Sequence, residues 1–153
     1  MEPPPSLAVP QFVVDASVAT KWYLNDEEFA DEALKVLLDF QEERITLIAP
    51  EHIRYEVPSA IRNAIRTDRI DPEKAWEQVR LFLQLRIPVV RTSAVIELGL
   101  HASLEYGCSF YDGLYLALAA ACEVPLIHAD GRLKRSIGGR FPYELWIADY
   151  GRP

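Results

Sequence analysis

The sequence is poor in cysteine, and it has no long apolar run and no basic leader. Its two cysteines, Cys108 and Cys122, lie in or beside expected helices. A chain of this size needs no disulfide framework, so we expect reduced thiols in a cytoplasmic protein. Residues 1–5 lack both a basic start and a long apolar run, so we expect neither a signal peptide nor a membrane span there. We expect residues 1–10 to form a flexible arm and residues 11–153 to form a single domain with a substantial core.

Positive charge is also scarce. Acids outnumber bases by 23 to 16, which gives a formal net charge of -7. This balance argues against a protein that is coated in positive charge and holds nucleic acid by bulk electrostatics. It leaves room for a local basic groove, because bases gather in two stretches. These are Arg54, Arg62, Arg66 and Arg69, and then Arg132, Lys134, Arg135 and Arg140.

Short apolar runs alternate with longer helical patterns along the chain, without an internal repeat. This alternation is typical of βα units around a mainly parallel sheet, so the predicted fold class is α/β, in compact layers. Five strands are expected, at residues 11–15, 45–48, 87–90, 125–129 and 144–147.

Two helices have clear boundary signals. Asp71 followed by Pro72 predicts a helix that begins with an N-cap aspartate. A second helix should begin near Thr92 and end at Gly107. The apolar residues that its spacing predicts to face inward are Ile96, Leu100 and Leu104.

A third helix is predicted over residues 53–64 from its apolar stripe. Glu56 lies on the edge of this stripe, where it faces protein rather than open water. Pro58 should weaken or kink the helix, because it cannot donate to the carbonyl of Arg54.

Four carboxylates lie at the edges of apolar segments, where a chain normally avoids unpaired charge. Asp15 and Asp130 each follow an apolar run that is expected to be a buried strand, and ligands in open α/β sheets collect at such strand ends. Asp112 opens the most apolar helix of the chain, and Glu56 lies on the helix edge described above. A metal site is therefore the first hypothesis.

Each acid taken alone also fits a structural role. Asp15 and Asp130 have the positions of helix N-caps. Ser109 and Asp112 have the spacing of a capping box. Glu56 is able to pair with an arginine. The metal hypothesis depends on the combination, since the expected topology would bring all four acids to one edge.

Repulsion between these acids has to be offset. Two carboxylates about 5 Å apart repel by roughly 3 kcal/mol at an effective dielectric of about 20. Four of them need a cation, bound protons or partner arginines. An all-oxygen donor set, supported by the Ser17 hydroxyl, suits Mg²⁺ or Mn²⁺ and does not suit zinc, which prefers histidine and thiolate. The histidines lack the spacing of a metal motif, and His128 is expected to be a satisfied strand-end residue.

Four short motifs contain these acids in order along the chain. They are Val14-Asp15-Ala16-Ser17, Tyr55-Glu56-Val57, Tyr111-Asp112-Gly113-Leu114-Tyr115 and Ala129-Asp130-Gly131-Arg132-Leu133. The ordered set resembles the PIN-domain ribonucleases, and more narrowly the VapC toxins of prokaryotic toxin-antitoxin pairs, over residues 11–149. The resemblance implies a three-layer α/β/α fold with a five-stranded parallel sheet in the order 3-2-1-4-5. In that order Asp15 and Asp130 lie side by side at the switch point.

The resemblance also implies a function, the Mg²⁺- or Mn²⁺-dependent hydrolysis of RNA by an endoribonuclease that leaves a 5′-phosphate and a 3′-hydroxyl. All four acids would be catalytic. Asp15, Asp112 and Asp130 would hold the ion, Glu56 would complete the acidic set, and Ser17 would orient it. The bound ion would supply a water of lowered pKa and positive charge beside the phosphate. The residues expected to contact the RNA backbone are Arg62, Arg66, Arg132 and Lys134.

Two partners are implied in the same way. The family resemblance implies a homodimer and a VapB-type antitoxin that inserts a peptide over the active site. Trp22, Tyr23 and the helix that carries Trp76 offer aromatic surface for such contacts, although aromatics at helical spacing are more often part of a core.

Three alternatives stay open at this point. A PIN-like RNA-processing nuclease without an antitoxin would use the same site, and a small upstream DNA-binding reading frame would mark a toxin pair instead. A catalytically idle PIN-like interaction domain would use the acids to bind a basic partner segment. A hydrolase or phosphotransferase with an aspartyl nucleophile at Asp15 normally has a second aspartate two residues on, where this chain has Ser17.

Overall fold

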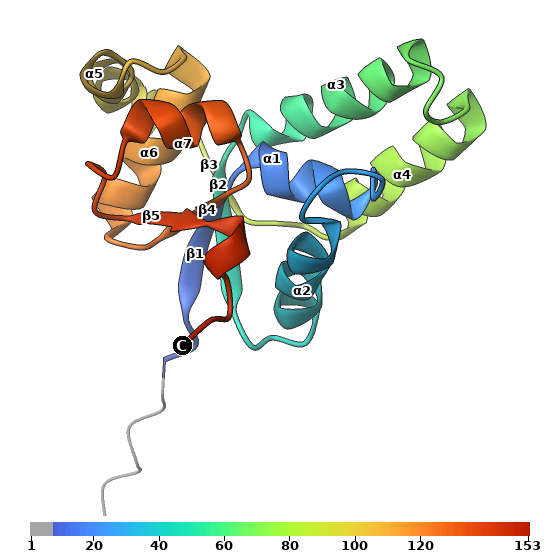
Figure 1. Cartoon of the computed structure of the whole chain (residues 1–153), viewed down its shortest axis with the longest axis horizontal. Helices are drawn as coiled ribbons and strands as arrows, with labels where there is room; N and C mark the ends of the chain where they lie inside the picture. The colour runs from blue at the N-terminus through green and yellow to red at the C-terminus, as the bar shows by residue number, and fades with distance from the viewer. Residues whose placement is uncertain (1–7) are drawn as a thin grey trace, which may run out of the picture.

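The computed structural model describes residues 8–153, which build a five-stranded parallel sheet flanked by helices (Figure 1). The strands are β1 (Gln11–Val14), β2 (Thr46–Pro50), β3 (Val89–Val90), β4 (Leu126–His128) and β5 (Glu144–Trp146). Their order in the sheet is β3-β2-β1-β4-β5. All five predicted strands are present, and the predicted α/β fold and strand order are confirmed. The first part of the predicted arm, residues 1–7, lies outside the described residues.

The central strand β1 is the switch point of the sheet. It pairs in parallel with β2 on one side, where Phe12 lies opposite Leu47, and with β4 on the other side, where Val14 lies opposite Ile127. Val14 and Ile127 are fully buried, as expected for apolar strands in the middle of a parallel sheet. Ligands of such sheets bind beyond the carboxyl ends of the strands at the switch point.

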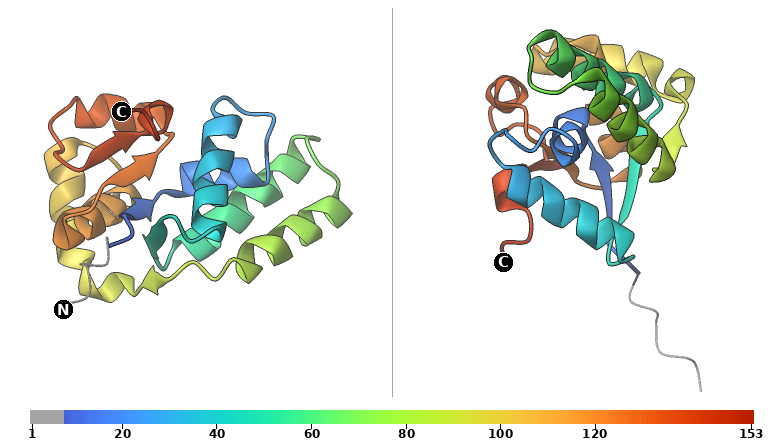
Figure 2. Two further views of the ribbon diagram at one scale, coloured as in Figure 1. Left: turned by 90° about the horizontal axis from the view of Figure 1, so that it is seen from below. Right: turned by 90° about the vertical axis from the view of Figure 1, so that its right-hand side faces the viewer.

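Helices cover both faces of the sheet. They are α1 (Ala16–Ala19), α2 (Ala30–Gln41), α3 (Ile53–Arg66), α4 (Pro72–Gln84), α5 (Ile96–Tyr106), α6 (Phe110–Cys122) and α7 (Gly131–Ile137), with short 3-10 helices η1 (Thr20–Trp22), η2 (Thr92–Ala94) and η3 (Ile147–Asp149). Figures 1 and 2 show α5 and α6 on one side of the sheet and α1 and α2 on the other. The hairpin of α3 and α4 projects from this body.

Local signals in the sequence set several helix ends as predicted. Asp71 caps α4 and accepts the Lys74 N–H at 2.7 Å. Gly107 ends α5 with a φ of 66°, a left-handed conformation that glycine adopts without a steric penalty. The apolar helix α6 packs against β1, β2 and β4 and is buried over residues 113–119.

The inward face predicted for α5 is wrong. The three residues predicted to face inward are exposed by 47%, 53% and 76%, in the order Ile96, Leu100 and Leu104. The buried face is made of small residues, Gly99, Ala102 and Ser103. A Cβ at Gly113 of α6 would collide with the backbone oxygen of Gly99, and a Cβ at Gly99 would crowd the Leu114 side chain, so the two glycines allow α5 and α6 to approach closely. Close contact between these backbones, rather than the apolar stripe, determines which face of α5 is buried.

Helix α3 follows its prediction more closely. Ile53, Val57 and Ile61 of the predicted stripe are buried. The helix runs through Pro58 without a break, although the ring removes the N–H that would donate to the carbonyl of Arg54. Pro58 therefore does not end the helix that carries Glu56.

No helix within residues 8–153 has the length and apolar character needed to cross a membrane.

Cys108 and Cys122 are free thiols, and burial raises the pKa of Cys108 to about 11. A thiol with so high a pKa stays protonated at neutral pH, so Cys108 is a poor nucleophile and a poor metal ligand.

Candidate active site

Asp15 and Asp130 follow the neighbouring strands β1 and β4. Asp15 caps α1, and its backbone N–H donates to the Ile127 carbonyl of β4 at 3.0 Å. Asp130 caps α7, which begins just beyond β4. The Ser17 hydroxyl accepts the Ala129 N–H at 2.9 Å and so ties α1 to the end of β4. The switch point of the sheet therefore carries both acids.

The predicted capping box holds Asp112 at the start of α6. The Ser109 hydroxyl accepts the Asp112 N–H at 3.0 Å, and Asp112 Oδ2 accepts the Ser109 N–H at 3.3 Å. Because α6 leads back to the amino end of β4, its own start lies at the carboxyl edge of the sheet. The third acid thus reaches the same edge as the first two.

Glu56 is held by a tyrosine from another helix. The Tyr115 hydroxyl of α6 donates to Glu56 Oε1 at 2.8 Å. The ring of His52 packs on Tyr115 with ring centroids 4.7 Å apart, and its Nε2 lies 3.1 Å from Glu56 Oε1 without hydrogen-bond alignment. Glu56 therefore joins α3 to α6 through a neutral donor, rather than through the arginine that was the alternative partner.

The structural roles proposed for the aspartates are real. Asp15 Oδ2 accepts the Ser17 N–H at 2.8 Å. Asp130 Oδ1 accepts the N–H groups of Arg132 at 2.8 Å and Leu133 at 3.2 Å. Each cap uses one carboxylate oxygen, so capping does not prevent the second oxygen of the same acid from binding a ligand. Helix capping and cation binding are therefore compatible roles.

Burial and mutual repulsion disfavour the charged form of two of these acids. Burial raises the pKa of Asp15 to about 7, against the opposing hydrogen bonds of Ser17, and the charges of Glu56 and Asp112 raise it further. Burial also raises the pKa of Asp112, and the charges of Asp130 and Glu56 add to the shift. The largest contributions to both shifts come from burial, from hydrogen bonds and from the other acids, and none of them comes from a lysine or arginine. The four acids form one electrostatic cluster that repels its own charge.

The donor chemistry of this cluster fits a hard divalent cation, because all four groups are carboxylates. Within residues 8–153, however, no three histidine, cysteine, aspartate or glutamate side chains are arranged as a ready metal-binding group. Mg²⁺ usually keeps several of its waters and is bound through one or two carboxylates. The residues present therefore fit an ion that is held partly through water, and they do not form a closed protein cage.

The residues predicted to contact RNA fall into two exposed pairs. Arg132 and Lys134 lie on α7, the helix that Asp130 caps, so their backbone positions are close to Asp130. Arg62 and Arg66 lie on the later turns of α3, along the projecting hairpin. The fold brings the α7 pair to the acidic edge and leaves the α3 pair further along the surface.

Tyr115 and His52 were not identified from the sequence. Burial raises the pKa of Tyr115 well above its ordinary value, so its hydroxyl stays protonated and remains a donor to Glu56. Tyr115 follows Asp112 by three residues, a spacing that places both on one face of α6. That spacing was the available signal for Tyr115. His52 precedes Glu56 by four residues, a helical spacing that was the available signal for their contact, whereas its packing against Tyr115 comes from α6.

His128 has the strand-end position that was expected, with one nitrogen partnered. Its Nε2 lies 3.0 Å from Glu144 Oε1, and its ring packs against Trp146 with centroids 5.3 Å apart. Its Nδ1 has no hydrogen-bond partner among the described residues. Burial lowers the pKa of His128, so the ring is neutral at physiological pH.

Replacing Asp15 by asparagine should remove a pH-dependent loss of stability. The folded-state pKa of about 7 exceeds the ordinary value of 3.8, so the folded protein binds this proton more tightly than the unfolded chain. In EDTA, ionisation of Asp15 therefore lowers the free energy of unfolding between about pH 4 and pH 7, by on the order of 4 kcal/mol. Urea unfolding of both proteins across this range measures the effect. The stability of Asp15→Asn relative to the wild type should rise with pH, and a constant difference would mean that Asp15 ionises normally in the fold.

Replacing Tyr115 by phenylalanine should destabilise the protein by about 1–3 kcal/mol, because it removes a buried hydrogen bond to a carboxylate. The measurement is urea unfolding at neutral pH. Tyr111→Phe is the matched control on the same helix, since the Tyr111 side chain is largely exposed. Equal stability of the two variants would show that the hydroxyl of Tyr115 does not hold Glu56.

Comparison with known proteins places these observations in a family. The model of the PIN domain family matches residues 12–136. Ribonuclease VapC12 of Mycobacterium tuberculosis is 34% identical over 133 residues, which cover 87% of this chain and 97% of that protein. Ribonuclease VapC1 of the same organism is 34% identical over 93 residues, or 59% of this chain and 67% of that protein.

Two solved structures share the fold. PAE2754 from Pyrobaculum aerophilum has a TM-score of 0.67 at 19% identity, over 92% of this chain and 85% of that chain. Mycobacterium tuberculosis VapC20, a sarcin-ricin loop cleaving toxin, has a TM-score of 0.58 at 15% identity, over 82% of this chain and 94% of that chain. With a family match over most of its length and the parallel sheet order in place, the chain belongs to the PIN domain family and is a distant relative of the VapC ribonucleases.

Proposed function

We propose that this protein is an endoribonuclease that hydrolyses RNA phosphodiester bonds at the acidic cluster with Mg²⁺ or Mn²⁺. The observation that carries the proposal is the electrostatic coupling of four carboxylates at the carboxyl edge of the sheet, where no lysine or arginine is among the largest influences on the pKa of Asp15 or Asp112. Such a cluster is stable only with bound protons or a bound cation. The kinship with proteins named ribonucleases supplies the class of reaction.

The acids have different tasks in this proposal. Asp15, Asp112 and Asp130 hold the ion, directly or through water, with oxygens that helix capping leaves available. Glu56 completes the acidic set. When bound, the ion supplies a water of lowered pKa and positive charge beside the scissile phosphate.

Two neutral residues position these acids. Ser17 donates its backbone N–H to Asp15 and accepts the Ala129 N–H with its hydroxyl, so it fixes the first acid relative to the end of β4. Tyr115 fixes Glu56 from the neighbouring helix. Neither residue carries charge, so both hold the acids in place without weakening their attraction for a cation.

RNA reaches this negative edge through nearby cations. Arg132 and Lys134 lie on α7, the helix that Asp130 caps, and are proposed to contact the phosphates that flank the scissile bond. Arg62 and Arg66 are proposed to contact the RNA further along α3.

The proposal extends to partners. A VapB-type antitoxin that covers the site and a cytoplasmic location follow from the kinship with VapC proteins. We also propose a homodimer, because α5 presents an apolar stripe to solvent. Its exposed members are Ile96, Leu100 and Leu104. Exposed apolar surface that follows one face of a helix marks a candidate protein contact.

An assay of RNA cleavage tests the catalytic proposal. The wild type should cleave RNA with Mg²⁺ or Mn²⁺ and lose activity in EDTA. Asp15→Asn and Asp112→Asn should each reduce cleavage by at least about two orders of magnitude, because each removes charge that balances the ion. Asp149→Asn is the control, since Asp149 is an exposed acid in η3 that pairs with Arg152.

Thermal unfolding in parallel separates failure of catalysis from failure of metal binding. A midpoint that rises with Mn²⁺ in the wild type and not in Asp15→Asn would report binding by linkage. Full metal-dependent cleavage by Asp15→Asn would overturn the catalytic roles. A protein that neither cleaves RNA nor responds to the ions would instead fit an idle interaction domain.

Sizing chromatography tests the proposed dimer and its surface. The wild type should elute as a dimer, and Leu104→Lys on α5 should shift it toward monomer, because a charge in the middle of an apolar contact is costly to bury. Trp76→Lys on α4 is the control for the other exposed apolar surface, on the projecting hairpin. If only Trp76→Lys dissociates the dimer, the interface lies on the hairpin of α3 and α4 and not on α5. A monomeric wild type would exclude the dimer.

A further inference from the structure

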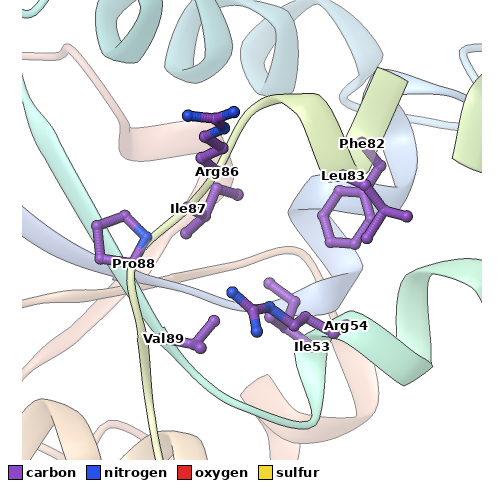
Figure 3. A pocket seen from close by; sticks show the side chains of 8 residues that line it. All are labelled: Ile53, Arg54, Phe82, Leu83, Arg86, Ile87, Pro88 and Val89. Carbon is purple, nitrogen blue, oxygen red and sulfur yellow. The ribbon is translucent and has the colours of Figure 1, made fainter. Parts of the chain in front are cut away.

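A hollow of about 380 Å³ lies beside the start of α3, outside the acidic cluster. It is enclosed by the first turn of α3, the end of α4 and the chain that enters β3. Figure 3 shows Arg86 and Arg54 on opposite sides of it, with Phe82 and Leu83 at one end and Val89 near the other. The hollow thus combines an apolar lining with two guanidinium groups.

The lining and the rim differ in exposure. Ile53, Phe82 and Ile87 are buried and give the hollow a rigid apolar floor. Arg54 and Arg86 are exposed at its rim. The hollow therefore offers an apolar floor to a flat apolar group and two exposed guanidinium groups at its rim to an anionic one.

Neither arginine is neutralised within the described chain. The arginines that pair with carboxylates there are Arg44, Arg69 and Arg152. Arg54 and Arg86 are absent from these ion pairs. Although the protein has a net charge of -7, the rim of this hollow therefore carries positive charge.

We propose that this hollow binds one nucleotide of a single-stranded RNA, with the base against the apolar floor and the phosphate between Arg54 and Arg86. Arginine suits this role because its planar group forms paired hydrogen bonds with phosphate. A nucleotide joins a flat base and an anionic phosphate in one unit, and base stacking with backbone charge is the usual basis of single-strand binding. An acidic peptide offers the charge without the flat apolar body.

The hollow would serve the acidic cluster as a substrate subsite, so this inference rests on the proposed nuclease function. Arg54 and Glu56 belong to the same first turn of α3, and they belong to different surface hollows. A strand that passes this turn would bind the hollow through one nucleotide and present another to the acids. The arginines thereby offset the repulsion that an acidic protein exerts on RNA.

The test is the binding of a fluorescein-labelled single-stranded RNA dodecamer, measured by fluorescence anisotropy in EDTA so that no metal-dependent cleavage occurs. Arg54→Gln and Arg86→Asn should each weaken binding by about tenfold, the effect of losing one strong charged contact. Each should also reduce the salt slope by about 0.7. Asparagine is chosen at position 86 because Arg86 has a φ of 51°, which asparagine tolerates well.

Arg80→Gln is the matched control, since Arg80 is an exposed arginine on α4 that does not line the hollow. Leu83→Gln tests the apolar part and should weaken binding without changing the salt slope. If the Arg54 and Arg86 variants bind the dodecamer no worse than the Arg80 variant, the proposal is overturned. It is also overturned if a polyglutamate peptide, and not the RNA, shows the dependence on these arginines.

The two proposals fail in distinguishable ways. Absence of cleavage with Mg²⁺ or Mn²⁺, together with arginine-dependent binding in EDTA, would reject the nuclease and retain an RNA site. Metal-dependent cleavage with unchanged binding by the arginine variants would retain the nuclease and reject the hollow as its subsite.

Discussion

Repulsion among carboxylates at the carboxyl edge of the sheet is the constraint on which the site depends. Asp15 is only 5% exposed, and burial with its acidic neighbours brings its pKa to about 7. Asp15 also caps α1 through the Ser17 N–H. An asparagine would keep this cap without the charge, because asparagine and aspartate are equally good N-caps. The helix start therefore does not by itself account for a charged side chain at this position, whereas a bound cation would.

Most of the fold was predictable because its signals act over short distances. The cap at Asp71 and the end of α5 at Gly107 depend on residues a few positions away, and the structure has both. The face of α5 was not predictable in this way. Periodicity identifies an apolar stripe, but it does not say whether the core or a partner covers that stripe. Here Gly99 and Gly113 allow another face of α5 to pack on α6, and the stripe remains outside.

For the candidate site, too, the local signals were predictable and the long-range contacts were not. Strand ends and helix starts placed Asp15, Asp112 and Asp130 at one edge, since each lies within a few residues of such a boundary. The partner of Glu56 was beyond reach, because Tyr115 lies 59 residues away and meets it only through the packing of α3 and α6. Sequence patterns thus located the charges. The contacts that orient them depend on tertiary packing.

The donors that orient the acids are all neutral. Backbone N–H groups and the Tyr115 hydroxyl hold the carboxylates at hydrogen-bond distance, as an arginine also would. An arginine in any of these places would neutralise its acid and compete with a divalent cation. The guanidinium groups of Arg54 and Arg86 instead lie beside a separate hollow. Keeping the two kinds of charge apart would leave the acids able to attract a cation and the arginines able to attract a polyanion, as the proposed nuclease activity requires.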